Sequence, residues 1–187
     1  LSGVCLDTGE SARNGKKKPS ELKMVATDGH RLAVITRPVE DFPQIERVIV
    51  PRKGLMEVRK LLDGGEEGEI GFDIKEGFLI VEAKDCKMSV RLIDGEFPDY
   101  NQVVPQKKGA IATLPAAEFA AALRRAVLMV TDKNKCVRLD FAPDSLSILS
   151  SSPELGESKE ELGIQYSGKQ LTIGFNARYL LEFASSI

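Results

Sequence analysis

Apolar positions along this chain follow two different spacings. Short runs of β-branched and aliphatic residues are typical of strands, whereas apolar residues three and four positions apart are typical of one helix face. Turn-forming residues such as Pro143-Asp144 separate the runs. The pattern predicts strands over residues 1–7, 23–27, 30–36, 69–74, 78–83, 87–93, 137–141, 145–150 and 161–166.

Three further predicted strands are each followed at once by a helix. They are 47–51 before 52–62, 110–114 before 116–129, and 171–175 before 177–186. Pro51 and Pro115 stand where a missing N–H costs little, and Asn176 can cap the third helix through its side chain. One strand, one helix and three strands then make a repeated unit, which predicts an α+β fold with antiparallel sheets and helices on one face.

Residues 25–33 form the most distinctive short motif. Asp28-Gly29 between two predicted strands is the strongest short signal for a two-residue hairpin with positive φ at both central residues. Such a turn would place His30 and Arg31 at the start of the second strand. The polar groups gathered here admit two interpretations: a reactive site, or a structural role in which the His30 ring fills space at the rim beside Leu32, and the pattern alone favours the second.

A catalytic interpretation would have to centre on His30, the single histidine, with Asp28. A lone histidine supplies no nucleophile, base and orienting group together, and neither a serine elbow nor metal-ligand spacing accompanies it. Gly64-Gly65 and Gly68 lack the ending of a phosphate-binding loop and are more typical of a helix C-cap and a turn. The sequence therefore predicts no catalytic residue, no metal and no cofactor.

Charge is separated by element. The chain has 26 Lys and Arg against 28 Asp and Glu, and a net charge of -2 excludes a protein that holds nucleic acid through overall positive charge. Leu55, Val58 and Leu62 supply the buried stripe of the first helix, which turns its basic residues to solvent. Basic helix faces could line a surface that faces phosphate, although the pattern alone favours ordinary solvated faces. The residues concerned are Arg52, Lys53, Arg59, Lys60, Arg124, Arg125 and Arg178.

Domain limits and cellular setting follow from composition. Residues 104–109 are polar and contain proline and glycine, which predicts a seam between domains 1–105 and 106–187. Residues 9–20, with three consecutive lysines, predict an exposed loop. The three cysteines are far apart and fit a reducing cytoplasm, and no apolar run approaches the roughly 18 residues that span a bilayer. The chain starts in a strand without methionine and ends in a helical pattern, so we expect a fragment.

Five short motifs resemble one known family. They are VATDGHRLA at 25–33, VIVPRK at 48–53, DGEFPDY at 94–100, YSG at 166–168 and IGFN at 173–176. In this order, and over nearly the whole chain, they strongly resemble the bacterial sliding clamps, the beta subunits of DNA polymerase III.

The resemblance implies a non-catalytic ring of two head-to-tail protomers, each with three similar domains and with helices lining the hole. It implies that the chain holds the middle domain without its first strand and helix, and the C-terminal domain without its last strands. Arg52 and Lys53 match family positions near the duplex, which such a ring contacts without regard to sequence. The other basic residues are assigned by their helix positions.

A second implication is a cleft for short linear motifs from the polymerase III alpha subunit, the clamp loader, other polymerases and repair proteins. Such a cleft suits leucine and phenylalanine anchors. Gln102 and Asn134 stand where relatives often carry arginine and an aromatic residue, which leaves the motif preference open. The residues implied are Leu1, Thr27, Gly29, His30, Arg31, Leu32, Pro98, Gln102, Val103, Asn134, Asn176 and Tyr179.

The resemblance also implies a protomer interface. Leu128 and Met129 match a position there, although the pattern alone favours the buried end of a helix. Glu154, Glu157 and Glu160 belong to the acidic stretch that would line the same contact. Two rival hypotheses remain: a peptide-binding adaptor with this fold that never forms a ring, and a hydrolase centred on the histidine of the hairpin.

Overall fold

The computed structural model describes residues 3–8, 20–39, 45–63, 70–83, 86–105, 109–132 and 134–187. The chain divides into two compact units, Leu1–Val104 (unit 1) and Pro105–Ile187 (unit 2). The loop expected at 9–20 lies outside the described residues except for Ser20, and so do Leu1 and the three glycines between 64 and 68. No helix in the described ranges has the length and apolarity needed to cross a membrane.

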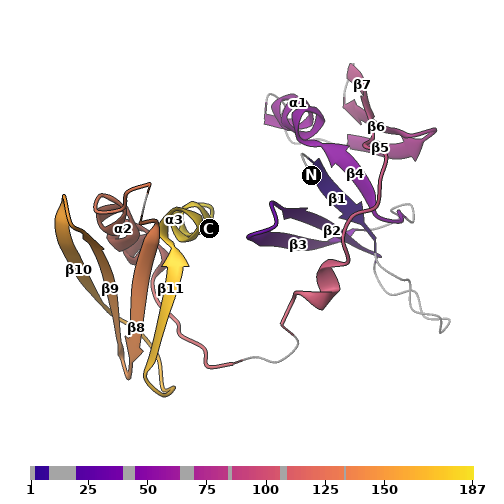
Figure 1. Ribbon diagram of the computed structural model, residues 1–187. Helices are drawn as coiled ribbons and strands as arrows, with labels where there is room; N and C mark the ends of the chain where they lie inside the picture. The colour runs from indigo at the N-terminus through magenta and orange to yellow at the C-terminus, as the bar shows by residue number, and fades with distance from the viewer. Residues whose placement is uncertain are drawn as a thin grey trace. The chain divides into compact units, whose positions relative to one another are not determined.

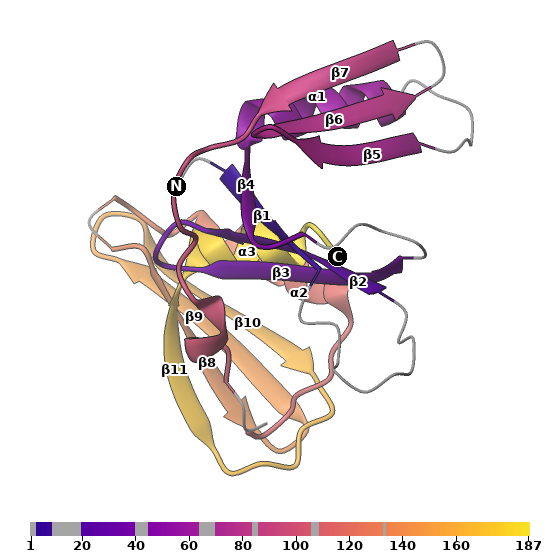
Figure 2. The same ribbon diagram turned by 90° about the vertical axis from the view of Figure 1, so that its right-hand side faces the viewer.

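Unit 1 is built on a four-stranded antiparallel sheet in the order β3-β2-β1-β4 (Figure 1). Its strands are β1 Gly3–Asp7, β2 Ser20–Thr27, β3 Leu32–Val39 and β4 Val48–Pro51. Helix α1, Arg52–Asp63, follows β4 directly and contacts β6 and β7 (Figure 2). Strands β5 Ile70–Lys75, β6 Phe78–Ala83 and β7 Cys86–Arg91 form a second antiparallel sheet.

Unit 2 repeats the four-stranded sheet in the order β10-β9-β8-β11. Its strands are β8 Cys136–Ala142, β9 Ser145–Ser152, β10 Gly156–Gly163 and β11 Leu171–Asn176. Helices α2, Ala116–Val127, and α3, Ala177–Ala184, contact each other and lie on one side of this sheet (Figure 1). The expected antiparallel sheets with helices on one face are therefore present in each unit.

The two four-stranded sheets share one topology. In each, three strands joined as a meander are followed by a fourth that returns beside the first, which is a Greek key. The fourth strand, β4 or β11, runs without interruption into a helix. Two of the three predicted strand-then-helix segments are seen in the fold, β4 into α1 with Pro51 directly before the helix, and β11 into α3. Helix α2 has Pro115 as its N-cap but no strand before it.

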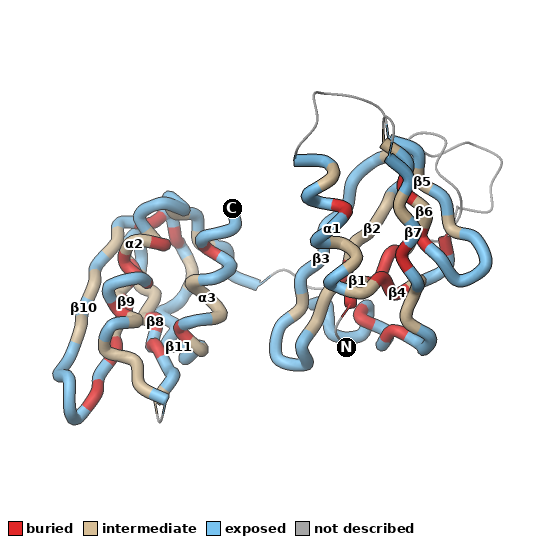
Figure 3. The backbone as a smooth tube through the Cα atoms, turned by 90° about the horizontal axis from the view of Figure 1, so that it is seen from above, coloured by how far each residue is buried: buried red, intermediate tan, exposed pale blue. Residues whose placement is uncertain are grey.

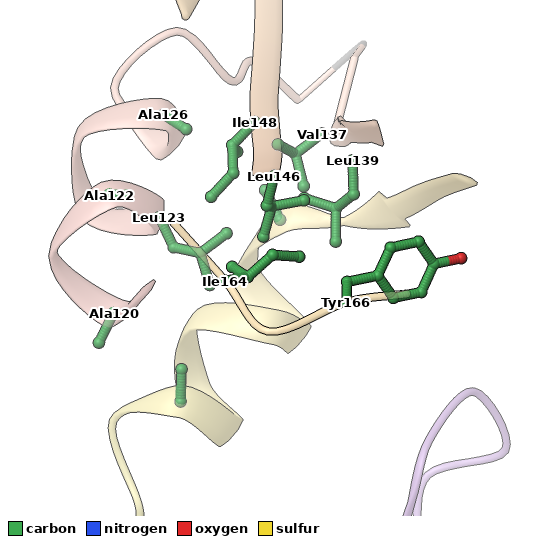
Figure 4. Close-up of a cluster of buried hydrophobic side chains, with 12 residues drawn as sticks. Ala120, Ala122, Leu123, Ala126, Val137, Leu139, Leu146, Ile148, Ile164 and Tyr166 are labelled. Carbon is green, nitrogen blue, oxygen red and sulfur yellow. The ribbon is translucent and has the colours of Figure 1, made fainter. Parts of the chain in front are cut away.

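The core of unit 2 fills the space between its helices and sheet. Ala122, Leu123 and Ala126 of α2 are fully buried and face Leu146 and Ile148 of β9 (Figure 4). Buried and less buried positions alternate along β8 and β9 (Figure 3), as expected for a sheet with one covered face. These residues form the inward face of α2.

The sheet of unit 1 is covered on both faces. Leu6 belongs to a cluster with Val58 of α1 and Leu79 of β6, whereas its neighbour Cys5 belongs to a second cluster with Phe97 and Tyr100. Successive residues of a strand point to opposite faces, so one short strand serves both clusters. The second cluster brings the segment after β7 onto the sheet.

Three element predictions need correction. Residues 110–114 form no strand, only one isolated bridge from Thr113 to Gln165, because no other described strand pairs with them. The strand predicted at 161–166 is instead β10, Gly156–Gly163. In α1, Leu61 packs against the core and Leu62 is 42% exposed, because the stripe follows the 55–58–61 spacing.

We expect Leu123→Ala to lower the free energy of unfolding of unit 2 by about 3 kcal/mol, because it opens a cavity in a packed core. Leu128→Ala is a matched control just after the same helix, where the side chain is exposed, and should change stability by less than about 0.5 kcal/mol. Urea unfolding of the two variants measures both. Equal effects would contradict the packing described for α2.

Candidate functional site

The β2–β3 hairpin carries most of the candidate residues in unit 1. Thr27 and Leu32 are the last paired residues, so residues 28–31 form a four-residue loop. Among these four loop residues, only Gly29 has positive φ, at 87°. The prediction of a two-residue turn with positive φ at both central residues is therefore wrong, and His30 and Arg31 lie in the loop rather than at the strand start.

Side-chain hydrogen bonds explain the longer loop. Asp28 Oδ1 accepts from the backbone N–H groups of His30 and Arg31, each at 3.0 Å, and Oδ2 accepts from Arg31 Nε at 3.0 Å. Thr27 Oγ1 donates to the Arg31 carbonyl at 2.8 Å and accepts from the Gly29 N–H at 3.1 Å. Asp and Thr side chains often replace backbone partners in this way.

The loop is exposed, so polar contacts and not burial hold its shape. The backbone N–H of His30 is the main reason why the pKa of the Asp28 carboxyl is lowered, and the bonds and charge of Arg31 add to it. A charged Asp28 thus fixes the backbone that presents His30 and Arg31 to solvent.

The second part of the candidate surface is the segment 97–104. Phe97 and Tyr100 are buried in the cluster with Cys5 and Val25, and Leu32 of β3 packs against the same cluster. The start of β3 and this segment therefore pack against one apolar cluster.

Outside this buried cluster, the segment 97–104 exposes both apolar and polar groups. Pro98 is exposed, and Val103 is 68% exposed. Gln102 Nε2 donates to Asp99 Oδ2 at 3.1 Å, and the N–H of Asn101 donates to Asp99 Oδ1 at 3.4 Å, which caps a single 3-10 turn at Tyr100–Gln102. Exposed apolar groups beside ordered polar ones suit a contact surface.

The candidate residues of unit 2 gather where β11 enters α3. Asn176 pairs with Cys136 across the sheet and caps α3 by accepting from the Arg178 N–H at 3.1 Å, as its sequence position predicts. Asn134 donates to the Ser151 carbonyl at 3.0 Å and accepts from the Cys136 N–H at 3.2 Å. Tyr179 is half-buried one turn into the helix. Both asparagine side chains thus also support unit 2 itself.

The basic residues of α1 differ in their partners. Arg59 pairs with Asp63 at 3.3 Å and Lys60 with Glu57 at 2.8 Å. Arg52 and Lys53 are exposed, and no acid within the described ranges pairs with them. The uncompensated charge of this helix therefore lies at its first turn.

Two residues expected in different roles are partners in unit 2. Arg125, expected to face DNA, donates from Nε and Nη2 to the two carboxylate oxygens of Glu160, expected at a protomer interface, at 2.8 and 2.6 Å. This bidentate pair lowers the pKa of Glu160 and raises that of Arg125. Each neutralises the charge of the other, and their separation of 35 positions concealed this pairing in the sequence.

The other expected basic residues of unit 2 are exposed, and so are the remaining expected interface residues except Met129. Arg124 Nη2 donates to Ser185 Oγ at 3.4 Å, and Arg178 lies 3.9 Å from Asp132. Leu128 is 68% exposed just beyond α2, so the buried helix end that the pattern favours is wrong for this residue, while Met129 is partly buried. Also exposed are Glu154 and Glu157.

No grouping of three His, Cys, Asp or Glu side chains suitable for a metal occurs in the part of the chain that the structure describes. An open hollow of about 560 Å³ lies at the start of α2, between Thr113–Pro115, Asp144 and Gly163–Gln165. It includes none of the candidate residues.

Comparison with known proteins gives a consistent result. The model of the DNA polymerase III beta subunit central domain matches residues 8–99, and that of the C-terminal domain of the same subunit matches residues 101–187. A beta sliding clamp of Salmonella typhimurium is 36% identical over 168 residues, which is 90% of this chain and 46% of that protein. The chain therefore spans about half the length of the curated relatives it matches.

Solved structures agree with this result. The DNA polymerase III subunit beta of Pseudomonas aeruginosa matches all of this chain and 49% of its own, with a TM-score of 0.88 and 31% identity. A sliding clamp of Bartonella birtlesii bound to griselimycin matches 98% of this chain and 48% of its own, with a TM-score of 0.86 and 28% identity.

We expect the Asp28 carboxyl to titrate below its ordinary pKa. Its contacts to the loop should persist at all higher pH and be lost as pH falls through the lowered value. Because the His30 N–H is the main cause, Arg31→Ala should return the pKa only part of the way. Carbon NMR of the carboxyl, followed with the His30 amide shift, measures both. An ordinary pKa in the unmodified chain would contradict the loop described.

Proposed function

The chain belongs to the DNA polymerase III beta subunit family, and we propose that it functions as part of a DNA sliding clamp, a ring that encircles duplex DNA and tethers the replicative polymerase. The observation that carries the proposal is the match of two successive domains of this subunit, in order, over nearly the whole chain. The repeated sheet backed by helices supports it from within the chain.

The charges of this chain suit a ring that slides. A closed ring cannot leave the duplex sideways, so it needs only weak contacts to phosphate that are independent of sequence. Arg52 and Lys53 provide basic groups without an acid partner in the described ranges, while Arg59, Lys60 and Arg125 are partly compensated. We therefore assign the main duplex contacts of this chain to the first turn of α1.

The hairpin loop and the segment 97–104 are the proposed docking surface for partners. Leu32 packs against the buried cluster that holds Phe97 and Tyr100, and Pro98 and Val103 are exposed in the same segment, which suits apolar anchors of a short linear motif. The proposed partners are the polymerase III alpha subunit, the clamp loader, other polymerases and repair proteins. Asn134, Asn176 and Tyr179 are the peptide contacts we propose on unit 2.

A ring also needs contact between protomers, and we propose a head-to-tail homodimer in the cytoplasm. Leu128 offers an exposed apolar side chain beyond α2, and Glu154 and Glu157 are exposed acids on and beside the β9–β10 turn. Glu160 is already paired with Arg125, so its contribution would be to order β10 and not to supply a free charge. The protein is proposed to be a scaffold without catalytic activity.

A protein of sliding-clamp length that carries this segment should be retained on nicked circular DNA after loading and should be released when the circle is cut. The physical reason is that a topological link survives only while the DNA has no ends. Gel filtration of loaded DNA before and after restriction cleavage measures retention. Failure to load, or retention that survives cleavage, would contradict the ring and favour an adaptor that only binds peptides.

Val103→Ala should weaken binding of a fluorescein-labelled peptide with leucine and phenylalanine anchors by about tenfold, because it removes an exposed apolar contact. Ile35→Ala is the matched control, since Ile35 is exposed on β3 away from the loop. Fluorescence anisotropy gives both affinities, and both variants should keep the unfolding temperature. A loss of peptide affinity in Ile35→Ala without a loss in Val103→Ala would contradict the proposed surface.

A further inference from the structure

We propose that Arg47 is a positioning residue for peptide binding: it locks the segment 97–104 onto the sheet of unit 1 so that Pro98, Gln102 and Val103 keep one arrangement. This inference rests on the proposed docking surface and adds a residue that lies outside it. None of the motifs that identify the chain includes Arg47, which immediately precedes β4.

The guanidinium of Arg47 joins three parts of unit 1 that are far apart in sequence. Arg47 Nε lies 3.6 Å from Asp7 Oδ2 at the end of β1, and Nη2 lies 3.3 Å from Asp99 Oδ1 in the segment. The guanidinium carbon Cζ of Arg47 lies 5.6 Å from the centre of the Tyr100 ring. The hydroxyl of Tyr100 donates to the same Asp7 oxygen at 3.4 Å, which closes the set of contacts.

Only arginine meets all of these demands. Its planar fork reaches two carboxylates at once and stacks on an aromatic face, whereas lysine is a single point charge. The backbone of Arg47 has φ of 37°, in the left-handed region that residues with a side chain rarely adopt. A residue held there without being glycine indicates that its surroundings fix its position.

Asp99 passes this restraint on to the docking residues. Besides Arg47, its carboxylate accepts from the backbone and side-chain nitrogens of Asn101 and from Gln102 Nε2. These bonds, with Gln102 first, lower the pKa of Asp99, so the carboxylate is charged at neutral pH. Two hydrogen bonds that share the Asp99 carboxylate thus connect Arg47 with Gln102, a residue proposed to touch the peptide.

Burial alone would not fix this segment in the same way. Phe97 and Tyr100 anchor it to the apolar cluster, but residues 101–104 are exposed. The side chains of Arg47 and Asp99 are each 41% exposed, so their ion pair adds little to overall stability. Its effect should therefore appear in the order of residues 101–104 and in peptide affinity, with the unfolding temperature nearly unchanged.

The test compares Arg47→Ala, Arg47→Lys and a control, Arg37→Ala, in the full chain. Arg37 is an exposed arginine of β3 whose Nη1 donates to the Thr36 carbonyl. Using a fluorescein-labelled peptide with leucine and phenylalanine anchors, we expect Arg47→Ala to weaken binding about tenfold because fewer molecules hold the competent arrangement. Arg47→Lys should recover part of the loss, and the control should stay within about twofold.

A second readout separates positioning from a general loss of stability. The N–H groups of Val103 and Val104 both donate to the Tyr100 carbonyl at 3.2 Å. Their hydrogen exchange, followed by NMR, should become faster in Arg47→Ala, while the amides of Met24 in β2 and Leu79 in β6 exchange as before. Asp99→Asn should give the same change, and the double variant should add little to either single one.

Two results would overturn the proposal. One is peptide affinity that is unchanged in Arg47→Ala, and the other is faster exchange spread evenly through unit 1. If the unmodified chain itself fails to bind the peptide, the proposed docking surface is wrong. The exchange pattern alone then shows whether Arg47 orders residues 101–104.

Discussion

Burial of one face of each four-stranded sheet is the constraint on which the other features depend. Leu123 and Ala126 reach the sheet of unit 2 from α2, and Val58 reaches the core of unit 1 from α1. Full burial of one such aliphatic side chain contributes about 2 kcal/mol. Because these residues fix how each helix is turned, they also decide which side chains remain at the surface, including Arg52 and Lys53 at the start of α1.

The proposed docking surface depends on the other face of the sheet in unit 1. Cys5 is fully buried there, and desolvation is the main reason why its pKa rises to about 11, so it packs as a neutral apolar group. Phe97 and Tyr100 cover it, and this places the segment after β7 beside the β2–β3 loop. A small apolar cluster thus supports a polar surface whose details are set by Asp28 and Asp99.

Much of the fold was accessible from the sequence because local rules determined it. The spacing of Pro51 and Pro115 before apolar stripes located α1 and α2, and Asn176 marked the start of α3. The family resemblance of the motifs found at 25–33 and elsewhere is shown by the domain matches. These features depend on residues within one turn or one strand of each other.

The features that were missed depend on contacts between distant residues or on side-chain capping. Nothing in the pattern links Arg125 to Glu160, although their pairing changes the role of both. The Asp28-Gly29 pair predicts a two-residue turn, because the bonds that the Asp28 carboxylate makes to the next two backbone N–H groups cannot be read from residue spacing. Which of the candidate residues touch DNA or peptide stays a prediction.

In the function we propose, a topological link, and not charge, holds the protein on DNA. The lifetime of a loaded ring on covalently closed circular DNA tests it most directly, measured at about 50 and about 200 mM salt. We expect lifetimes at the two salt concentrations that agree within about twofold, since weak phosphate contacts do not limit escape from a closed ring. A fall of about a thousandfold, as expected for a protein held by six or more phosphate contacts, would contradict it.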